Sequence, residues 1–215
     1  MIPAFMIRSR RGRTVGMCRS GTGTLLAALL TMATVVTSSG MAEEAPIDAQ
    51  TLIESLDLKG HVEGGFYRRT YEATNQPRVD SDGAERFSMT SIYYLLTAEG
   101  PIGHFHQNRS DIVHYFHLGD PIEYVLIHPD GEMETRVMGA DPRKGQLLQM
   151  TVPGGVWKAS RLTGVEQGYG LISEAVSPGF DYGDMTLGVT AELLATYPQH
   201  RSYIEALSRE SAPKR

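Results

Sequence analysis

The sequence predicts an all-β barrel or sandwich with a short N-terminal helix and a C-terminal helical segment. Short runs rich in Val, Ile, Tyr, Phe and Leu alternate with Gly, Pro, Asn and Asp at nearly regular intervals, which is typical of strands joined by tight turns. The composition agrees, with 23 Gly, 11 Pro and 10 Tyr among 215 residues. A hydrophobic content of 41% is enough for one core, and the length fits a single domain with accessory segments.

The first 42 residues read as a secretion signal. They carry five arginines and no acidic residue, then an apolar run from Leu25 to Val36, then small residues up to Ala42. The apolar run is shorter than the roughly 20 residues that cross a bilayer, although a retained N-terminal anchor is the alternative. We therefore expect an exported protein, periplasmic or secreted, by a Sec or a Tat route. The expected organisation is a signal peptide over 1–42, a linker over 43–49, one domain over 50–207 and a tail over 208–215.

Charge and cysteine content restrict the function of the mature chain. Residues 43–215 hold 15 basic and 25 acidic side chains, a formal net charge of −10. This charge disfavours nucleic acid and anionic membrane surfaces as partners, so neither is expected once the signal is removed. The one cysteine, Cys18, lies in the predicted signal, which excludes thiolate catalysis, disulfides and cysteine-ligated metals from the mature protein.

The elements follow in order along the chain. Asp48 is predicted to cap a first helix with Leu52 and Leu56 on one face, and Gly60 ends it. Pro198 is predicted to begin the C-terminal helical segment. Between them, strands are predicted over residues 66–73, 87–97, 102–106, 112–118, 122–128, 132–138, 146–152, 155–162 and 168–176.

Four of the seven histidines fall within fourteen residues, at positions 104, 106, 114 and 117. Residues at i and i+2 of a strand share a face, so His104 and His106 are expected to point the same way. After a turn, the apolar face of the next strand carries His114 among Ile112, Phe116 and Leu118. We therefore expect His104, His106 and His114 to converge inside the barrel. Such imidazoles suit a divalent transition metal or acid–base chemistry, and the simplest alternative is packed polar residues without a ligand.

Several segments resemble a known family. Residues 103–120, beginning Gly103-His104-Phe105-His106, resemble the first cupin motif, and residues 145–158 resemble the second. More narrowly, residues 61–66 (HVEGGF), 91–96 (SIYYLL), 152–157 (VPGGVW) and 177–181 (SPGFD) look like the cupin subfamily DUF985, or cupin 5. The resemblance covers roughly residues 50–207. It implies a double-stranded β-helix, the cupin jelly roll, as in deoxysugar epimerases of the RmlC type, and a homodimer. The subfamily's biochemical function is largely unassigned.

This chain departs from the cupin metal site in two places. The usual carboxylate falls at Asp111 or at Ile112, depending on the count, and the last histidine is replaced by Lys158. One reading is therefore one divalent transition metal held by His104, His106 and His114 with Asp111. The other has no metal: His106, with His104 and Lys158, forms a catalytic site like that of metal-free epimerases of this fold, in which a histidine removes an acidic C–H proton and a lysine steadies the enolate oxygen.

Other polar side chains complete the predicted pocket. Ligand-binding roles are expected for His114, Glu63, Arg68, Tyr94 and Gln149. The sequence thus favours a protein that binds a small polar molecule in its barrel, and an isomerase-, epimerase- or lyase-like acid–base enzyme acting on a sugar-like or hydroxy-acid substrate. The alternatives are a metal-dependent cupin with a three-histidine site and a non-catalytic small-ligand binding protein.

Overall fold

The computed structural model describes residues 46–211. The expected signal peptide with Cys18, the first three residues of the expected linker and residues 212–215 of the expected tail lie outside this part of the chain. Within residues 46–211, no helix is both long enough and apolar enough to cross a membrane.

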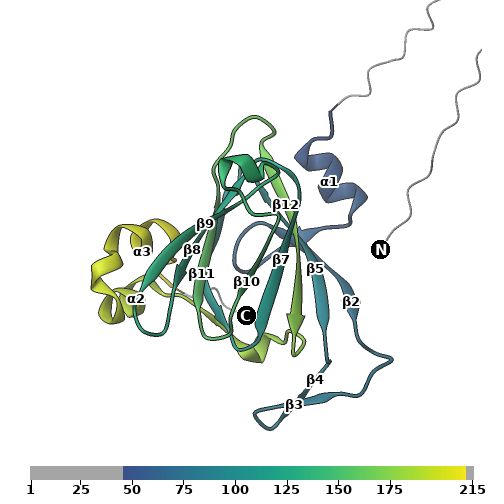
Figure 1. Cartoon of the computed structure of the whole chain (residues 1–215), viewed down its shortest axis with the longest axis vertical. Helices are drawn as coiled ribbons and strands as arrows, with labels where there is room; N and C mark the ends of the chain where they lie inside the picture. The colour runs from purple at the N-terminus through teal and green to yellow at the C-terminus, as the bar shows by residue number, and fades with distance from the viewer. Residues whose placement is uncertain (1–45, 212–215) are drawn as a thin grey trace, which may run out of the picture. The chain divides into compact units, whose positions relative to one another are not determined.

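Two antiparallel sheets face each other and form the barrel, which confirms the predicted jelly roll (Figure 1). The six-stranded sheet has the order β1-β2-β5-β12-β7-β10 and the five-stranded sheet the order β13-β6-β11-β8-β9. A separate hairpin, β3-β4, projects from the end of the barrel. The strands are β1 (Lys59–Gly60), β2 (Phe66–Glu72), β3 (Val79–Ser81), β4 (Ala84–Arg86), β5 (Thr90–Thr97), β6 (Ile102–Asn108), β7 (Asp111–Gly119), β8 (Ile122–Ile127), β9 (Met133–Met138), β10 (Gln149–Val152), β11 (Trp157–Leu162), β12 (Tyr169–Ser177) and β13 (Met185–Leu187).

The helices are short and lie outside the barrel. Asp48 caps α1 (Ala49–Ser55) as predicted, because its Oδ1 accepts the backbone N–H of Thr51 at 2.8 Å. At the other end of the chain, α2 (Thr190–Thr196) and α3 (Arg201–Leu207) pack side by side. The described part of the chain also has three short 3₁₀ turns: η1 (Pro142–Lys144), η2 (Tyr182–Asp184) and η3 (Pro198–His200).

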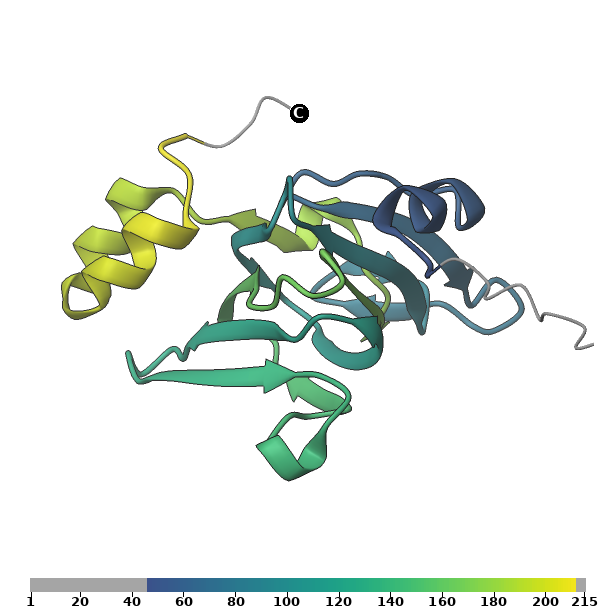
Figure 2. The ribbon, with the colours of Figure 1, turned by 90° about the horizontal axis from the view of Figure 1, so that it is seen from above.

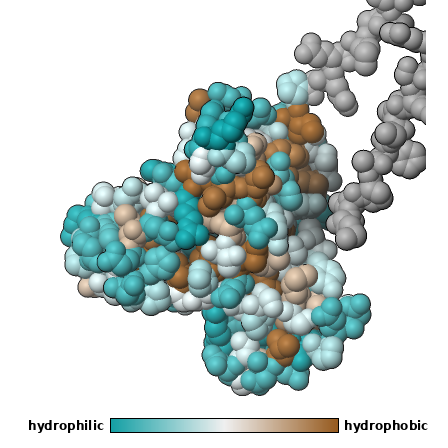
Figure 3. Space-filling model, viewed as in Figure 1, coloured by the Kyte–Doolittle hydropathy of each residue, from teal (hydrophilic) through white to brown (hydrophobic). Residues whose placement is uncertain are grey.

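Strand β8 shows how the core is arranged. Tyr124 and Leu126 point between the two sheets, whereas Val125 and Ile127 point outward against Leu193 of α2 and Ile204 of α3. Both faces of this strand are covered, so its sequence is apolar without alternation. Figure 2 shows α2 and α3 on one side of the barrel, and the exposed surface of this helical lobe is mostly hydrophilic in Figure 3.

The predicted strands agree with the observed ones to within a few residues, but β1, the β3-β4 hairpin, β13 and α2 were not predicted. The turn-rich stretch over 74–85 contains most of the β3-β4 hairpin. β13 and α2 follow a segment with few β-formers and no helix cap: Val189, at the N-cap of α2, makes no side-chain capping bond. Tertiary packing, rather than local sequence preference, therefore sets these elements.

Candidate active site

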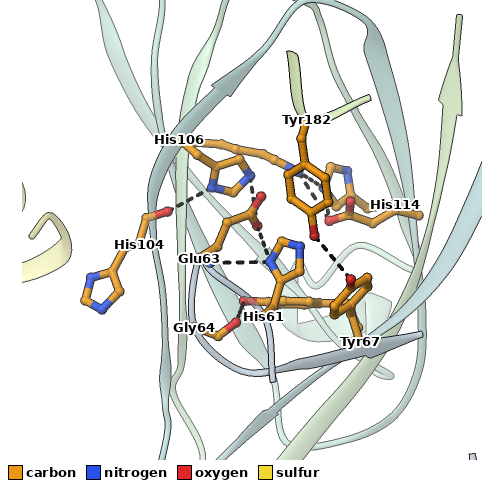
Figure 4. Close-up of polar contacts among 11 residues, drawn as sticks. His61, Glu63, Gly64, Tyr67, His104, His106, His114 and Tyr182 are labelled. Atoms are coloured by element: carbon orange, nitrogen blue, oxygen red, sulfur yellow. Dashed lines mark hydrogen bonds and ion pairs between the residues drawn. The ribbon is translucent and has the colours of Figure 1, made fainter. Parts of the chain in front are cut away.

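Two cross-strand pairs bring four polar side chains into the barrel. His106 of β6 lies opposite Lys158 of β11 in the five-stranded sheet, and His114 of β7 lies opposite Glu174 of β12 in the six-stranded sheet. His106, His114 and Lys158 are 5%, 0% and 2% exposed. Because the sheets face each other, the two pairs meet in the interior (Figure 4).

Lys158 joins the two sheets. Its Nζ lies 3.0 Å from His114 Nε2 and 3.2 Å from Glu174 Oε1, and these two acceptors are 3.1 Å apart. An ammonium group has only donors, so both neighbours accept from Lys158. The buried lysine thus has one of its three N–H groups left for another partner.

Glu63 enters the barrel from the loop before β2. Its Oε2 lies 3.2 Å from His106 Nε2 and 3.4 Å from His61 Nδ1. The loop is held against β6, because His104 N–H donates to Glu63 O at 2.7 Å. Gly64 permits this approach: its φ is +107°, and a Cβ there would collide with the carbonyl of Ile102.

The charges of the site follow from burial and from its neighbours. Burial alone would raise the pKa of Glu174, but the charge of Lys158 and the contact with His114 hold it well below its usual value. Burial lowers the pKa of His106 to about 4 despite the nearby Glu63. Burial and the charge of Lys158 also lower the pKa of His114. At neutral pH both histidines are therefore uncharged, and His106 Nε2 is able to accept a proton.

The carboxylate of Glu63 is ionised as well. Burial opposes ionisation, but the neighbouring His106 and His61 bring its pKa below the usual value. Glu63 Oε2 and His106 Nε2 thus face each other at 3.2 Å with a place for one proton between them. His106 Nδ1 is already used, since it lies 2.8 Å from His104 O and donates to it.

A cavity of about 20 Å³ lies between Glu63 and Glu174. A cavity of this size holds about one water molecule. Near its mouth, the hydroxyl groups of Tyr67 and Tyr182 lie 3.1 Å apart. Its walls are His61, Glu63, Tyr67, Arg69, Ile92, Asn108, Ile112, Glu174, Val176 and Phe180.

His104 does not share the face of His106, contrary to expectation. A β-bulge lies between the pairs Lys158–His106 and Ser160–Gly103, so two residues of β6, His104 and Phe105, oppose one residue of β11. The bulge turns the ring of His104 away from His106 and Glu63 (Figure 4). It lies instead near the backbone of Leu207, and burial and Arg209 lower its pKa.

The expected metal set is not assembled for the same reason. His104 is turned away, and Asp111 is exposed and accepts the N–H of Gly154 at 2.8 Å, which fixes a turn outside the barrel. His114 is bonded to Lys158, whose charge would repel a dication. Across residues 46–211, no three His, Cys, Asp or Glu side chains are grouped as a metal site. The proposed ligands therefore do not fit a metal ion.

Three of the expected ligand-binding residues do not line this cavity. Arg68 pairs with Tyr93 and points to the outer face of the sheet, so Arg69 takes the inward position. Gln149 is exposed because Met150 and Val152 occupy the inward positions of β10. Tyr94 is inside the barrel, but its hydroxyl donates to Gly64 O at 3.0 Å and its ring belongs to the core.

The site also holds residues that were not in the predicted set, among them Glu174, His61 and Asn108. Glu174 could have been predicted from the sequence, because it is a carboxylate on the same face of β12 as the inward Ile172 and Val176. His61 and Asn108 could not, since a loop and a strand end have no fixed facing.

The fold and this interior site define the class of protein: a jelly-roll barrel with a buried cluster of histidines, carboxylates and one lysine. The family described as "Cupin superfamily (DUF985)" matches residues 50–188, and the chain belongs to it.

Its relatives come from distant organisms. The chain is 39% identical over 155 residues to the uncharacterized protein YML079W of Saccharomyces cerevisiae, a match that covers 66% of this chain and 76% of the yeast protein. The structure of a hypothetical protein from Leishmania major has a TM-score of 0.72 and 35% identity, over 76% of this chain and 100% of that one. The structure of protein SO0799 from Shewanella oneidensis has a TM-score of 0.70 and 36% identity, over 77% of this chain and 100% of that one.

Proposed function

We propose that this chain binds a small polar molecule in its barrel and moves a proton on it, as an isomerase- or lyase-like enzyme acting on a sugar-like or hydroxy-acid compound. One observation carries the proposal: a buried carboxylate–histidine pair, Glu63 and His106, lies across the cavity from Glu174, which is supported by Lys158 and His114. Buried titratable groups that perturb one another around a cavity are characteristic of acid–base sites.

Glu63 and His106 form the proton-accepting side. A proton taken from a carbon atom of the ligand would sit between His106 Nε2 and Glu63 Oε2, which are 3.2 Å apart. The carboxylate would stabilise the imidazolium, and His104 O holds the ring in orientation through Nδ1.

Lys158 supports the opposite side. Removal of a proton beside a carbonyl group leaves negative charge on the oxygen, which a buried ammonium stabilises strongly in a low-dielectric site. His114 and Glu174 fix the position of the ammonium group and take two of its N–H groups. The third N–H is the donor that we assign to the ligand oxygen.

Solvent exchange tests this proposal without a known reaction. The protein is incubated in D₂O with a panel of aldoses, ketoses, 2-hydroxy acids and amino sugars, and proton NMR follows loss of the C–H signal beside the carbonyl. We expect exchange with at least one compound, reduced about 100-fold or more in His106→Asn and Lys158→Met. His104→Asn is the matched control and should keep the activity, because that ring lies outside the site. Equal exchange in all four proteins would refute the assignment.

A non-catalytic binding protein is the second candidate. The observation that favours it is the small size of the cavity, about 20 Å³, behind the paired hydroxyls of Tyr67 and Tyr182. Stoichiometric binding of a compound from the panel, with no exchange of any of its C–H protons over days, would decide for this candidate.

We also propose export and self-association. Export rests on the arginine-rich and apolar character of residues 1–42, and N-terminal sequencing of the mature protein tests it. A chain that retains Met1 in the cytoplasm would contradict it. Homodimer formation rests on the family resemblance, and light scattering after size-exclusion chromatography measures it.

A further inference from the structure

The cavity is lined by hydrogen-bond acceptors that lack a donor. Glu63 Oε2 is the centre of this arrangement, with two imidazole nitrogens within 3.4 Å. The protonation of these two rings decides what the cavity can bind.

Neither imidazole nitrogen carries a proton toward Glu63. His106 donates through Nδ1 to His104 O, and its Nε2 is buried without a hydrogen-bond partner. His61 Nδ1 accepts the backbone N–H of Glu63 at 3.4 Å, so its lone pair is already engaged and it offers no proton to Glu63 Oε2. Two acceptor atoms that no donor of residues 46–211 satisfies, Glu63 Oε2 and His106 Nε2, therefore face each other at 3.2 Å (Figure 4).

Two further acceptors line the same cavity. Asn108 is 8% exposed, and its Oδ1 is buried without a hydrogen-bond partner. Glu174 Oε1 accepts from Lys158 and lies 3.1 Å from His114 Nε2, which leaves Oε2 available. A buried acceptor that no donor satisfies is destabilising, and an unpaired buried carboxylate more so, which favours a ligand that supplies donors.

Among the described residues that line the cavity, the Lys or Arg side chain is Arg69, and it is already engaged. Arg69 Nη1 binds Glu72 Oε1 at 2.9 Å, and its guanidinium lies 5.7 Å from the ring centre of Phe180. The rings of Tyr67 and Phe180, which also line the cavity, are favourable neighbours for a cation. The space of about 20 Å³ admits one small group.

We propose that this cavity binds a protonated amine, so that the ligand of the acid–base site is an amino compound such as an amino sugar or an amino acid. The ammonium group would donate to Glu63 Oε2, Asn108 Oδ1 and Glu174 Oε2. This inference rests on the proposed function, because it names the class of ligand that the same site takes.

Ammonium and methylammonium chloride are the probes. Thermal unfolding of the purified protein at pH 7 is compared in 100 mM of each salt, with sodium chloride at the same ionic strength as reference. A dissociation constant near 10 mM would raise the midpoint by about 3–6 °C. Glu63→Gln, which has the same shape and no charge, should remove the rise, and Asn108→Leu should reduce it. Glu205→Gln is the matched control, because Glu205 is exposed and pairs with Arg201 on the surface.

Each other outcome overturns the proposal. No rise with either ammonium salt would mean that the cavity holds water only. An equal rise with potassium chloride would make it a general site for monovalent cations, and a rise with sodium acetate or sodium phosphate would show preference for an anion. An ammonium effect that survives Glu63→Gln would place binding elsewhere. Exchange on a neutral sugar without an ammonium effect would reject the amine and leave the acid–base function standing.

Discussion

Lys158 Nζ lies 3.0 Å from His114 Nε2, and His114 is fully buried. A lysine at this depth is stable only with a nearby negative charge, and Glu174 supplies it. The two residues come from opposite sheets, so their contact also ties the walls of the barrel together.

Replacing Lys158 alone should destabilise the protein more than replacing both Lys158 and Glu174. Lys158→Met leaves the Glu174 carboxylate buried alone, so we expect a loss of about 3 kcal/mol or more in the free energy of unfolding. Urea denaturation of Lys158→Met, Glu174→Gln and the double variant measures the coupling. The double variant should be more stable than Lys158→Met. Strictly additive effects would show that the contact contributes nothing.

Stability should fall as the pH drops from about 6.5 to about 4. Burial lowers the pKa of His106 to about 4 in the folded protein, whereas an unfolded histidine titrates near 6.5. The unfolded state therefore binds a proton first, and the stability present above pH 6.5 is lost in this window, by roughly 3 kcal/mol. Urea denaturation between pH 4 and 7 measures the slope. His106→Asn should flatten it more than His117→Asn, because His117 points outward from an exposed position, although burial lowers its pKa as well.

The carboxylate of Glu174 should act in a more acidic window. Its pKa is held well below the usual value, so its stabilisation is complete above about pH 4.5, where the unfolded group ionises, and is lost as the pH falls below that value. Glu174→Gln should remove this acid-sensitive component, as followed by circular dichroism during acid titration. A wild-type protein with constant stability below pH 4.5 would contradict the buried ion pair.

Gly64 should tolerate no side chain. A Cβ at this position would collide with Ile102 O in addition to the strain of a positive φ, so Gly64→Ala should cost about 3 kcal/mol or more. Gly83→Ala is the matched control. Its φ is +80° but nothing lies within 4 Å of the added atom, and only the backbone cost of about 1–2 kcal/mol is expected. Equal losses in thermal unfolding would mean that the loop before β2 can move away from β6.

The mouth of the cavity should open when Tyr182 is shortened. Tyr182→Ala removes the hydroxyl contact with Tyr67 and a ring that lies 6.4 Å from that of His61. We expect modification of His61 and His106 by diethyl pyrocarbonate, followed by mass spectrometry, to become several-fold faster. Tyr115→Ala, on the exposed outer face, should leave the rate unchanged. An unchanged rate in Tyr182→Ala would show that access does not pass this residue.

Most of the fold could be predicted from the sequence because turn residues mark the strand ends. The inward face of β7, with Ile112, His114 and Phe116, followed from its apolar character. The inward position expected for Leu118 was wrong, because the register shifts between Leu171 and Ile172 of β12. Leu118 packs instead with the hydrophobic cluster that includes Leu95 and Leu171, on the other face of the sheet. Alternation predicts which residues share a face only between such irregularities.

The site was harder to predict for the same reason. The spacing of His104 and His106 is that of a regular strand, and nothing in the local sequence marks the bulge opposite Ala159. The choice between Arg68 and Arg69 depends on the absolute register of β2, which pairing with β5 determines. Glu63 and Lys158 were found through the family motifs rather than through any periodic pattern.

The placement of the charged cluster in the strand register has a consequence for how such a barrel can diversify. Lys158, His106, His114 and Glu174 stay together as long as four strands keep their pairing, which the whole core enforces. The segments around Glu63 and Tyr182 lie in a loop and a 3₁₀ turn outside that pairing. Substitutions and length changes there would alter which molecule is admitted while leaving the proton-handling core intact. One scaffold could thus acquire new ligands without having to rebuild its chemistry.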